Sequence, residues 1–135
     1  MNAVDRDRIE SVGSAVVDSA IRVHRALGPG LLESAYQACL SRELRSAGLW
    51  VDTEVEIPIE YRGYRVNVGY RIDMLVEQEV VIENKVVERL LPVHTAQLLT
   101  YLELSGHQLG YLLHWNMTLM KSGIHRFVVG NWDTN

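Results

Sequence analysis

Two acids and a lysine, Asp73, Glu83 and Lys85, are spaced so that they could bind a cation together. They fall within the stretch D-M-L-V-E-Q-E-V-V-I-E-N-K, which is typical of two strands joined by a short turn. If this hairpin is symmetric about Gln78, Asp73 lies opposite Glu83, with their Cβ atoms about 5 Å apart. Like charges in such a pair destabilise a sheet. A divalent cation such as Mg²⁺ would remove the repulsion, because hard cations bind carboxylate oxygens.

The turn between these strands decides whether the two carboxylates meet. An odd-length turn at residues 77–79 pairs Asp73 with Glu83, and Lys85 then shares the face of Glu83. This arrangement suits metal-assisted attack on a phosphodiester. A two-residue turn would pair Asp73 with residue 82 or 84 and send the carboxylates to opposite faces. E-Q-E contains no Asn-Gly or Asp-Gly signal, so the sequence leaves both registers open.

The segment that carries Glu83 and Lys85 is otherwise apolar. Residues 80–87 are interrupted only by Glu83, Asn84 and Lys85, and such a run is typical of a central strand covered on both faces. Charged side chains are costly there unless they are paired or coordinated. The pattern therefore favours a functional role for the triplet.

Two helices are expected before the strands. Apolar residues recur at steps of three and four over about residues 7–27, where Gly28-Pro29-Gly30 ends the helix. A second helix is expected over about residues 31–47, with Gly48 as its C-terminal stop. Its inward positions would be Leu32, Ala35, Cys39 and Leu40.

Strands and one further helix account for the rest of the chain. Strands are expected over about residues 53–60, 65–73, 80–87, 109–115 and 124–129, with a tight turn at Arg62-Gly63. Pro92 can open a helix that continues to about Ser105. The predicted order, ααβββαββ, indicates a mixed sheet with helices on both sides, an α/β or α+β fold.

The helix after Pro92 contains few charged residues. Only Glu103 is charged, so we expect this helix to be covered by other parts of the chain. Its polar residues His94, Gln97 and Tyr101 step by three and four and therefore share one face. Gln97 and Tyr101 are expected to point at something polar.

The composition limits the class of protein. The 135 residues suit a single domain over residues 1–135. A net charge of −4 argues against a broadly basic surface that grips nucleic acid, although it does not exclude a local basic groove. Cys39 is the only cysteine, which excludes an internal disulfide and favours a reducing cytoplasm; we expect it to be packed. No apolar run approaches the roughly 20 residues that span a bilayer, so no membrane association is expected.

The sequence G-L-L-E-S-A-Y at residues 30–36 resembles the signature of the GxxExxY proteins, a family grouped with the PD-(D/E)XK nuclease-like superfamily. The resemblance covers about residues 16–129, including D-M-L-V, E-N-K, H-T-A-Q-L-L-T-Y and G-I-H-R. It implies a mixed sheet with flanking helices and a nuclease that uses Mg²⁺ or Mn²⁺ on DNA or RNA. Asp73 and Glu83 would be metal ligands, and Lys85 would orient the attacking water or stabilise charge on the phosphate.

The same resemblance implies further site residues. Glu33 matches the acidic position that completes the metal shell in many members, and the backbone carbonyl of Asn84 would be a further ligand. Gln97 and Tyr101 match the Q-x-x-x-Y pattern of RecB-like nucleases, where these residues shape the site and touch nucleic acid. The chain departs from the first motif at Ile72, which stands where proline would precede Asp73.

Simpler interpretations of these residues stay open at this point. Asp73 could pair with Arg71 or Arg65, Glu83 could form an ordinary ion pair with Lys85, and Glu33 suits the first turn of any helix. Candidates for phosphate steering are Arg62, Arg65, Arg89 and Lys121. Two other functions also stay open: a catalytically inactive nuclease-like fold that binds nucleic acid or a protein partner, and a structural subunit of a homo-oligomer.

Overall fold

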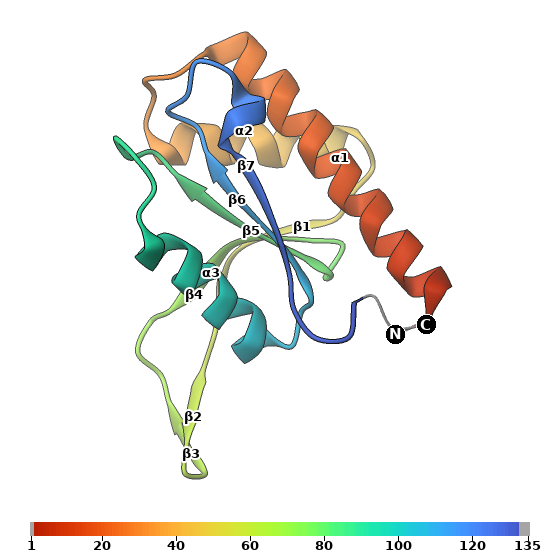
Figure 1. Cartoon of the computed structure of the whole chain (residues 1–135), viewed down its shortest axis with the longest axis vertical. Coiled ribbons are helices and arrows are strands. Elements are labelled where there is room, and N and C mark those ends of the chain that lie inside the picture. Colours follow the sequence, from red (N-terminus) through yellow and green to blue (C-terminus); the bar gives the residue numbers. More distant parts are fainter. Residues whose placement is uncertain (1, 133–135) are drawn as a thin grey trace.

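A computed structural model describes residues 2–132, in which a five-stranded mixed sheet lies between two layers of helix (Figure 1). The strand order is β1-β4-β5-β6-β7, with only the β5–β6 pair parallel. The helices are α1 (Ala3–Leu27), α2 (Glu33–Ser46), α3 (Pro92–Ser105) and a short 3₁₀ helix, η1 (Met120–Gly123). The strands are β1 (Val51–Glu56), β2 (Ile59–Tyr61), β3 (Tyr64–Val66), β4 (Arg71–Val76), β5 (Val80–Lys85), β6 (Leu109–His114) and β7 (Ile124–Val128).

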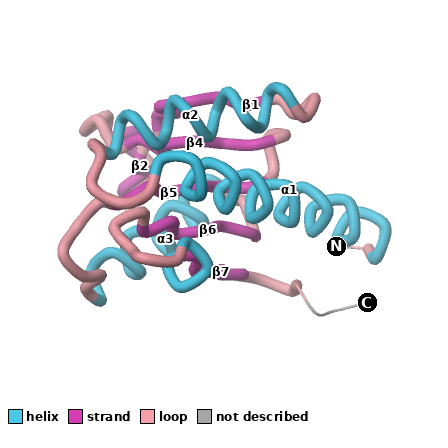
Figure 2. The backbone as a smooth tube through the Cα atoms, turned by 90° about the horizontal axis from the view of Figure 1, so that it is seen from above, coloured by secondary structure: helices cyan, strands magenta, loops and turns pink. Residues whose placement is uncertain are grey.

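The sheet has a hydrophobic core on each face. Apolar side chains of α1 and α2, among them Val16 and Tyr36, pack on one face together with Trp115. On the other face, Leu98 and Leu102 of α3 complete a smaller core. Figure 2 shows α1 and α2 lying across the strands on the same side. The predicted mixed α+β architecture with helices on both faces is confirmed.

The predicted inward face of α2 is wrong at two positions. Leu32 precedes the helix and is exposed, and Cys39 is also exposed, although both were expected to pack inward. The buried positions are Tyr36, Leu40, Ser41 and Leu44. The Tyr36 ring stacks on Trp115 with centroids 4.7 Å apart, and this contact sets the rotation of the helix. Cys39 is therefore turned toward solvent.

Each of the first two predicted strands is divided in the structure. The expected strand at 53–60 is split between β1 and β2 at Pro58, which has no N–H to donate to a ladder. The expected strand at 65–73 is split between β3 and β4, with Gly69 at a φ of +80°. The strands β2 and β3 form a separate hairpin that projects from the body (Figure 1). The observed order is therefore ααβββββαββ.

The β4–β5 hairpin adopts the symmetric register. Met74 pairs with Ile82 and Val76 with Val80, so the pairing is centred on Gln78. The turn at 77–79 has three residues, and Glu77 and Gln78 have φ values of 51° and 56°. This odd-length turn resolves the question that the sequence left open. The strand β5 is central and buried, as predicted.

The structure also bears on membranes. Among residues 2–132, none of the helices combines the length and the hydropathy needed to cross a bilayer.

Candidate active site

Asp73 and Glu83 lie side by side where β4 and β5 separate. The recorded pairing of these strands ends at Met74–Ile82, one position before the two acids. From there the carboxylates act as acceptors: the Asp73 N–H donates to Glu83 Oε1 at 3.0 Å, and the Asn84 N–H donates to Asp73 Oδ2 at 2.8 Å. Each acid is thus fixed by the backbone of the opposite strand. We call this arrangement the carboxylate clamp.

The backbone of β1 and β4 is irregular beside the clamp. The register of β1 on β4 runs through Thr53–Met74 and Val55–Ile72 but omits Glu54, whose φ is 54°. A positive φ is uncommon for a glutamate. Such a backbone conformation costs energy and persists only where the surrounding structure fixes it. Asp73, which lies between Ile72 and Met74, lines a hollow of about 660 Å³ with residues of α2 and β1. The hollow gives solvent and ligands access to Asp73.

Burial makes both acids of the clamp difficult to ionise. Desolvation raises the pKa of Glu83 to about 8, and the charge of Asp73 adds to the effect. Desolvation also raises the pKa of Asp73 to about 6, with a contribution from Glu33. The backbone N–H donors and the nearby Lys85 act in the opposite direction on both pKa values. Two adjacent carboxylates in this state are suited to a cation, which would favour the ionised form of both.

Lys85 is half-buried at the end of β5, two positions after Glu83. It lowers the pKa of both acids, so it lies within their electrostatic reach. It nevertheless forms no ion pair within 4.0 Å with either acid in the described part of the chain. Asp73 likewise forms none with Arg71 or Arg65 over residues 2–132. The simple ion pairs that the sequence allowed are therefore not formed.

Glu33 opens α2 and lines the same hollow as Asp73. Its charge raises the pKa of Asp73 and of Glu83. However, no three His, Cys, Asp or Glu side chains within residues 2–132 gather closely enough to hold a metal between them. The protein donors that fit a cation are the two clamp carboxylates. This set fits Mg²⁺ or Mn²⁺, since Mg²⁺ commonly binds one or two carboxylates and keeps several waters.

The side chain of Asn84 turns away from the clamp. Its Oδ1 accepts a hydrogen bond from Trp115 Nε1 at 2.9 Å, and its Nδ2 donates to Gln37 Oε1 at 3.3 Å. Gln37 Nε2 in turn donates to Glu54 Oε1 at 2.9 Å. This network joins α2 to β1 and β5. Because it occupies the side chain of Asn84, the backbone carbonyl is the part of Asn84 that could bind a metal. Sequence reasoning missed Gln37 and Glu54, although Gln37 follows Glu33 by one helical turn.

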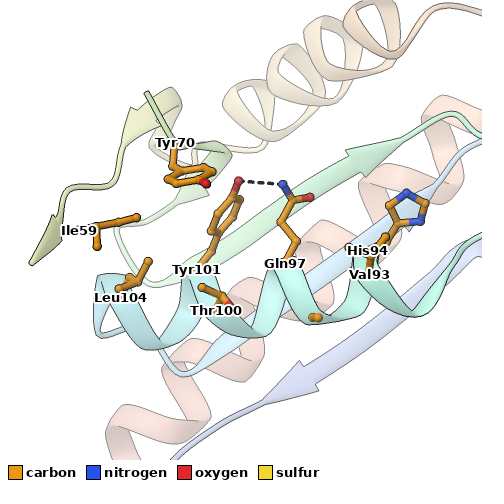
Figure 3. Close-up of a pocket in the computed structure, with 9 residues that line it drawn as sticks. Ile59, Tyr70, Val93, His94, Gln97, Thr100, Tyr101 and Leu104 are labelled. Carbon is orange, nitrogen blue, oxygen red and sulfur yellow. Dashed lines mark hydrogen bonds between the residues drawn. The ribbon is translucent and has the colours of Figure 1, made fainter. Parts of the chain in front are cut away.

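Gln97 and Tyr101 of α3 line a second hollow of the protein, beside the helix (Figure 3). Gln97 Nε2 donates to Tyr101 Oη at 2.9 Å. Burial raises the pKa of Tyr101, and the charge of Glu83 adds to the rise, so Tyr101 lies within electrostatic reach of the clamp. His94, on the same face, accepts a hydrogen bond from the Leu91 N–H through Nδ1 and caps the helix.

The prediction that this helix is covered is wrong for its outer surface. Val93 is 63% exposed and Leu104 is 40% exposed. The buried positions of α3 are Leu98, Tyr101 and Leu102, which form a narrow stripe against the sheet. The scarcity of charged residues on α3 therefore reflects an open apolar groove next to the helix, not a covering element.

The four cations proposed for phosphate steering lie in three places. Arg62 and Arg65 are exposed on the β2–β3 hairpin, and Arg89 is exposed between β5 and α3. Lys121 belongs to η1 and lines a different hollow, together with residues of α1. No ion pair holds any of them within the described residues.

Comparison with known proteins identifies the family. A family model described as the PD-(D/E)XK nuclease superfamily matches residues 10–127. The chain belongs to this superfamily. Its central mixed sheet with flanking helices agrees with the PD-(D/E)XK fold. The matched range includes Asp73, Glu83 and Lys85, the acids of the clamp and the adjacent lysine.

A solved structure supports the fold assignment. The crystal structure of SSO0001 is similar with a TM-score of 0.50 and 23% sequence identity, over 93% of this chain and 61% of that one. Identity at this level shows the shared fold. The present chain spans about three fifths of the SSO0001 chain. No curated protein matches the sequence.

Proposed function

We propose that this PD-(D/E)XK superfamily member is a nuclease that uses Mg²⁺ or Mn²⁺ to hydrolyse phosphodiester bonds of DNA or RNA. Within the superfamily we assign it to the GxxExxY proteins, on the signature at residues 30–36. The observation that carries the proposal is the carboxylate clamp. Asp73 and Glu83 are fixed side by side and resist ionisation, and no protein cation within residues 2–132 pairs with them.

The chain's own groups have distinct roles in this proposal. Asp73 and Glu83 would hold the metal, and the Asn84 and Asp73 N–H groups orient them. When bound, the metal supplies Lewis acidity toward the phosphate and a more acidic water. Lys85 places its ammonium on the face of Glu83, where it orients the attacking water or stabilises charge on the phosphate oxygens.

Two residues outside the clamp have supporting roles. Glu33, which lines the same hollow as Asp73, would hold a water of the metal shell. Tyr101, oriented by Gln97, borders the path of the substrate. Both would act on groups bound at the clamp.

The raised pKa values have a consequence for metal binding. A carboxylate must be ionised to bind the metal, so binding displaces any proton that the clamp holds. Since the pKa of Glu83 is about 8 and that of Asp73 is about 6, the metal competes with protons throughout the neutral range. Metal affinity should therefore increase with pH up to about 8.

The direct test is cleavage of labelled single-stranded and double-stranded DNA and RNA with Mg²⁺, Mn²⁺ or EDTA. The proposal predicts metal-dependent cleavage by the wild-type protein and a large loss in Lys85→Ala. Arg42→Ala is the matched control, because Arg42 is an exposed cation on α2 without a role in the clamp. Equal cleavage by Lys85→Ala and the wild type would indicate a contaminating nuclease. No cleavage of any substrate would overturn the proposal.

A further inference from the structure

Three Tyr-Arg pairs lie on and beside the projecting hairpin. They are Tyr61-Arg62, Tyr64-Arg65 and Tyr70-Arg71. We call residues 59–71 the arm. Three arginines and the single acid Glu60 give the arm a formal charge of +2, while the whole chain carries −4. The arm is therefore a local basic segment on an otherwise acidic protein.

The aromatic rings of the arm are open to solvent. Tyr61 is 61% exposed, Tyr64 is 75% exposed and Tyr70 is 45% exposed. The hairpin extends beyond the rest of the molecule (Figure 1). Monomeric proteins rarely expose clustered apolar surface without a use for it, and such clusters mark binding sites. The arm is therefore a candidate for contact with a ligand.

The hairpin geometry places two of these rings on one face. Tyr61 is paired directly with Tyr64, and Ile59 with Val66, so these side chains share a face. The turn between them uses Arg62 and Gly63 with φ values of 50° and 81°, which suits a tight two-residue turn. The Arg62 guanidinium lies 5.5 Å from the centroid of the Tyr61 ring. A flat aromatic face with an adjacent guanidinium is therefore presented at the tip.

This face continues into the groove beside α3. Ile59 and Tyr70, from the base of the arm, line a hollow of about 560 Å³ together with Tyr101 and other residues of α3 (Figure 3). The rings of Tyr70 and Tyr101 have centroids 6.3 Å apart and are inclined by 54°. Tyr101 in turn lies within electrostatic reach of Glu83. The groove therefore extends from the base of the arm to Tyr101, whose hydroxyl group is affected by the charge of Glu83.

We propose that the arm binds single-stranded nucleic acid and guides it along this groove to the clamp. Bases would stack on Tyr61, Tyr64 and Tyr70, and the neighbouring arginines would contact phosphates. Stacking on aromatic side chains needs an accessible base face, which a single strand offers and a duplex hides. The negatively charged phosphates would be attracted to the basic arm and repelled by the rest of the protein, which is acidic overall. This inference rests on the proposed nuclease function and names its substrate class.

The test is binding of a fluorescein-labelled oligothymidylate, measured by fluorescence anisotropy in EDTA. The Tyr61→Leu/Tyr64→Leu variant should bind about tenfold more weakly or worse, because it keeps apolar area but loses the stacking rings. Tyr61→Phe/Tyr64→Phe retains both rings and should bind like the wild type. Thermal denaturation confirms that each variant folds. Equal affinity of the Leu variant and the wild type would overturn the inference.

Salt dependence tests the arginines separately. Each phosphate contact on a single strand adds about 0.7 to the slope of log K against log salt. Arg62→Ala/Arg65→Ala should reduce the magnitude of this slope by roughly 1.4, whereas Arg42→Ala should leave it unchanged. A matched duplex should bind more weakly than the single strand. Duplex binding as tight as single-strand binding would contradict the stacking role.

Two further results separate this inference from its alternatives. Binding in EDTA does not need the metal, so oligonucleotide binding without any cleavage would uphold the arm and refute only the nuclease. Cleavage that is unaffected by the Leu variant would refute only the arm. Light scattering tests the alternative that the arm binds a second copy of the chain. Loss of a dimer in the Leu variant, with oligonucleotide binding unchanged, would assign the arm to self-association and overturn the inference.

Discussion

Replacing Glu83 with glutamine should change how stability depends on pH in the metal-free protein. Glu83 is buried, and its pKa rises from 4.5 to about 8. An acid whose pKa is raised by folding keeps its proton in the folded state while the unfolded chain has lost it. The stability that Glu83 contributes is therefore fully present below about pH 4.5 and is lost as the pH rises toward 8.

The size of this effect follows from the pKa interval. Each pH unit between the two pKa values is worth about 1.4 kcal/mol, so the interval from 4.5 to about 8 sets an upper bound of roughly 5 kcal/mol. The titration belongs to the Asp73–Glu83 pair, not to Glu83 alone. Glutamine keeps an Oε1 that can accept from the Asp73 N–H. Glu83→Gln should therefore remove much of the pH slope while preserving the hydrogen bond.

The assay is urea denaturation in EDTA at several pH values. Wild type and Glu83→Gln should differ little near pH 4 and diverge by a few kcal/mol as the pH approaches 8, with Glu83→Gln the more stable. Glu103→Gln is the matched control, since Glu103 is exposed on α3. It should follow the wild type. Parallel pH profiles for wild type and Glu83→Gln would refute the account of a clamp that resists ionisation.

Three further predictions concern the metal and the supporting structure. Mn²⁺ at about 100 times its dissociation constant should stabilise the wild type by roughly 2.7 kcal/mol, more at pH 8 than at pH 6, and Asp73→Asn should lose this shift in a thermal scan. An equal shift in both proteins would place the metal elsewhere. Asn84→Ala leaves Trp115 Nε1 buried without its acceptor, so the free energy of unfolding measured with urea should fall by about 1–3 kcal/mol. An unchanged urea midpoint would show that this hydrogen bond is not needed for stability. A Cβ at Gly123 would lie 2.0 Å from the carbonyl oxygen of His114, so Gly123→Ala should lower the free energy of unfolding by about 1–3 kcal/mol. A Gly123→Ala variant as stable as the wild type would disprove this close contact.

Sequence periodicity predicted the parts of the fold that depend on local signals. The helix α3 spans Pro92–Ser105 as expected, because Pro92 suits the first helical position and Gly106 adopts a left-handed conformation at the C-cap. The central position of β5 followed from its apolar run. Where local signals conflicted with alternation, as at Pro58, the predicted strand was too long.

Other features depend on contacts that a single sequence does not reveal. The register of the β4–β5 hairpin is set by a three-residue turn whose Glu77 and Gln78 adopt positive φ without any glycine. The rotation of α2, which exposes Cys39, is set by stacking of Tyr36 on Trp115, far away in the chain. The cytoplasmic location inferred from the single cysteine stays a prediction. The involvement of Gln37 in the site depends on Asn84, which reaches it only in the folded sheet.

The central claim is that the Asp73–Glu83 clamp is a metal-dependent hydrolytic centre. Its most direct measurement is cleavage of a labelled oligonucleotide by wild type and Asp73→Asn as Mn²⁺ is titrated from zero. The claim predicts that the wild type does not cleave in EDTA and that its cleavage rate rises to saturation as Mn²⁺ is added. It predicts no such saturating cleavage for Asp73→Asn. Cleavage that persists without metal, or that is the same in Asp73→Asn, would contradict it.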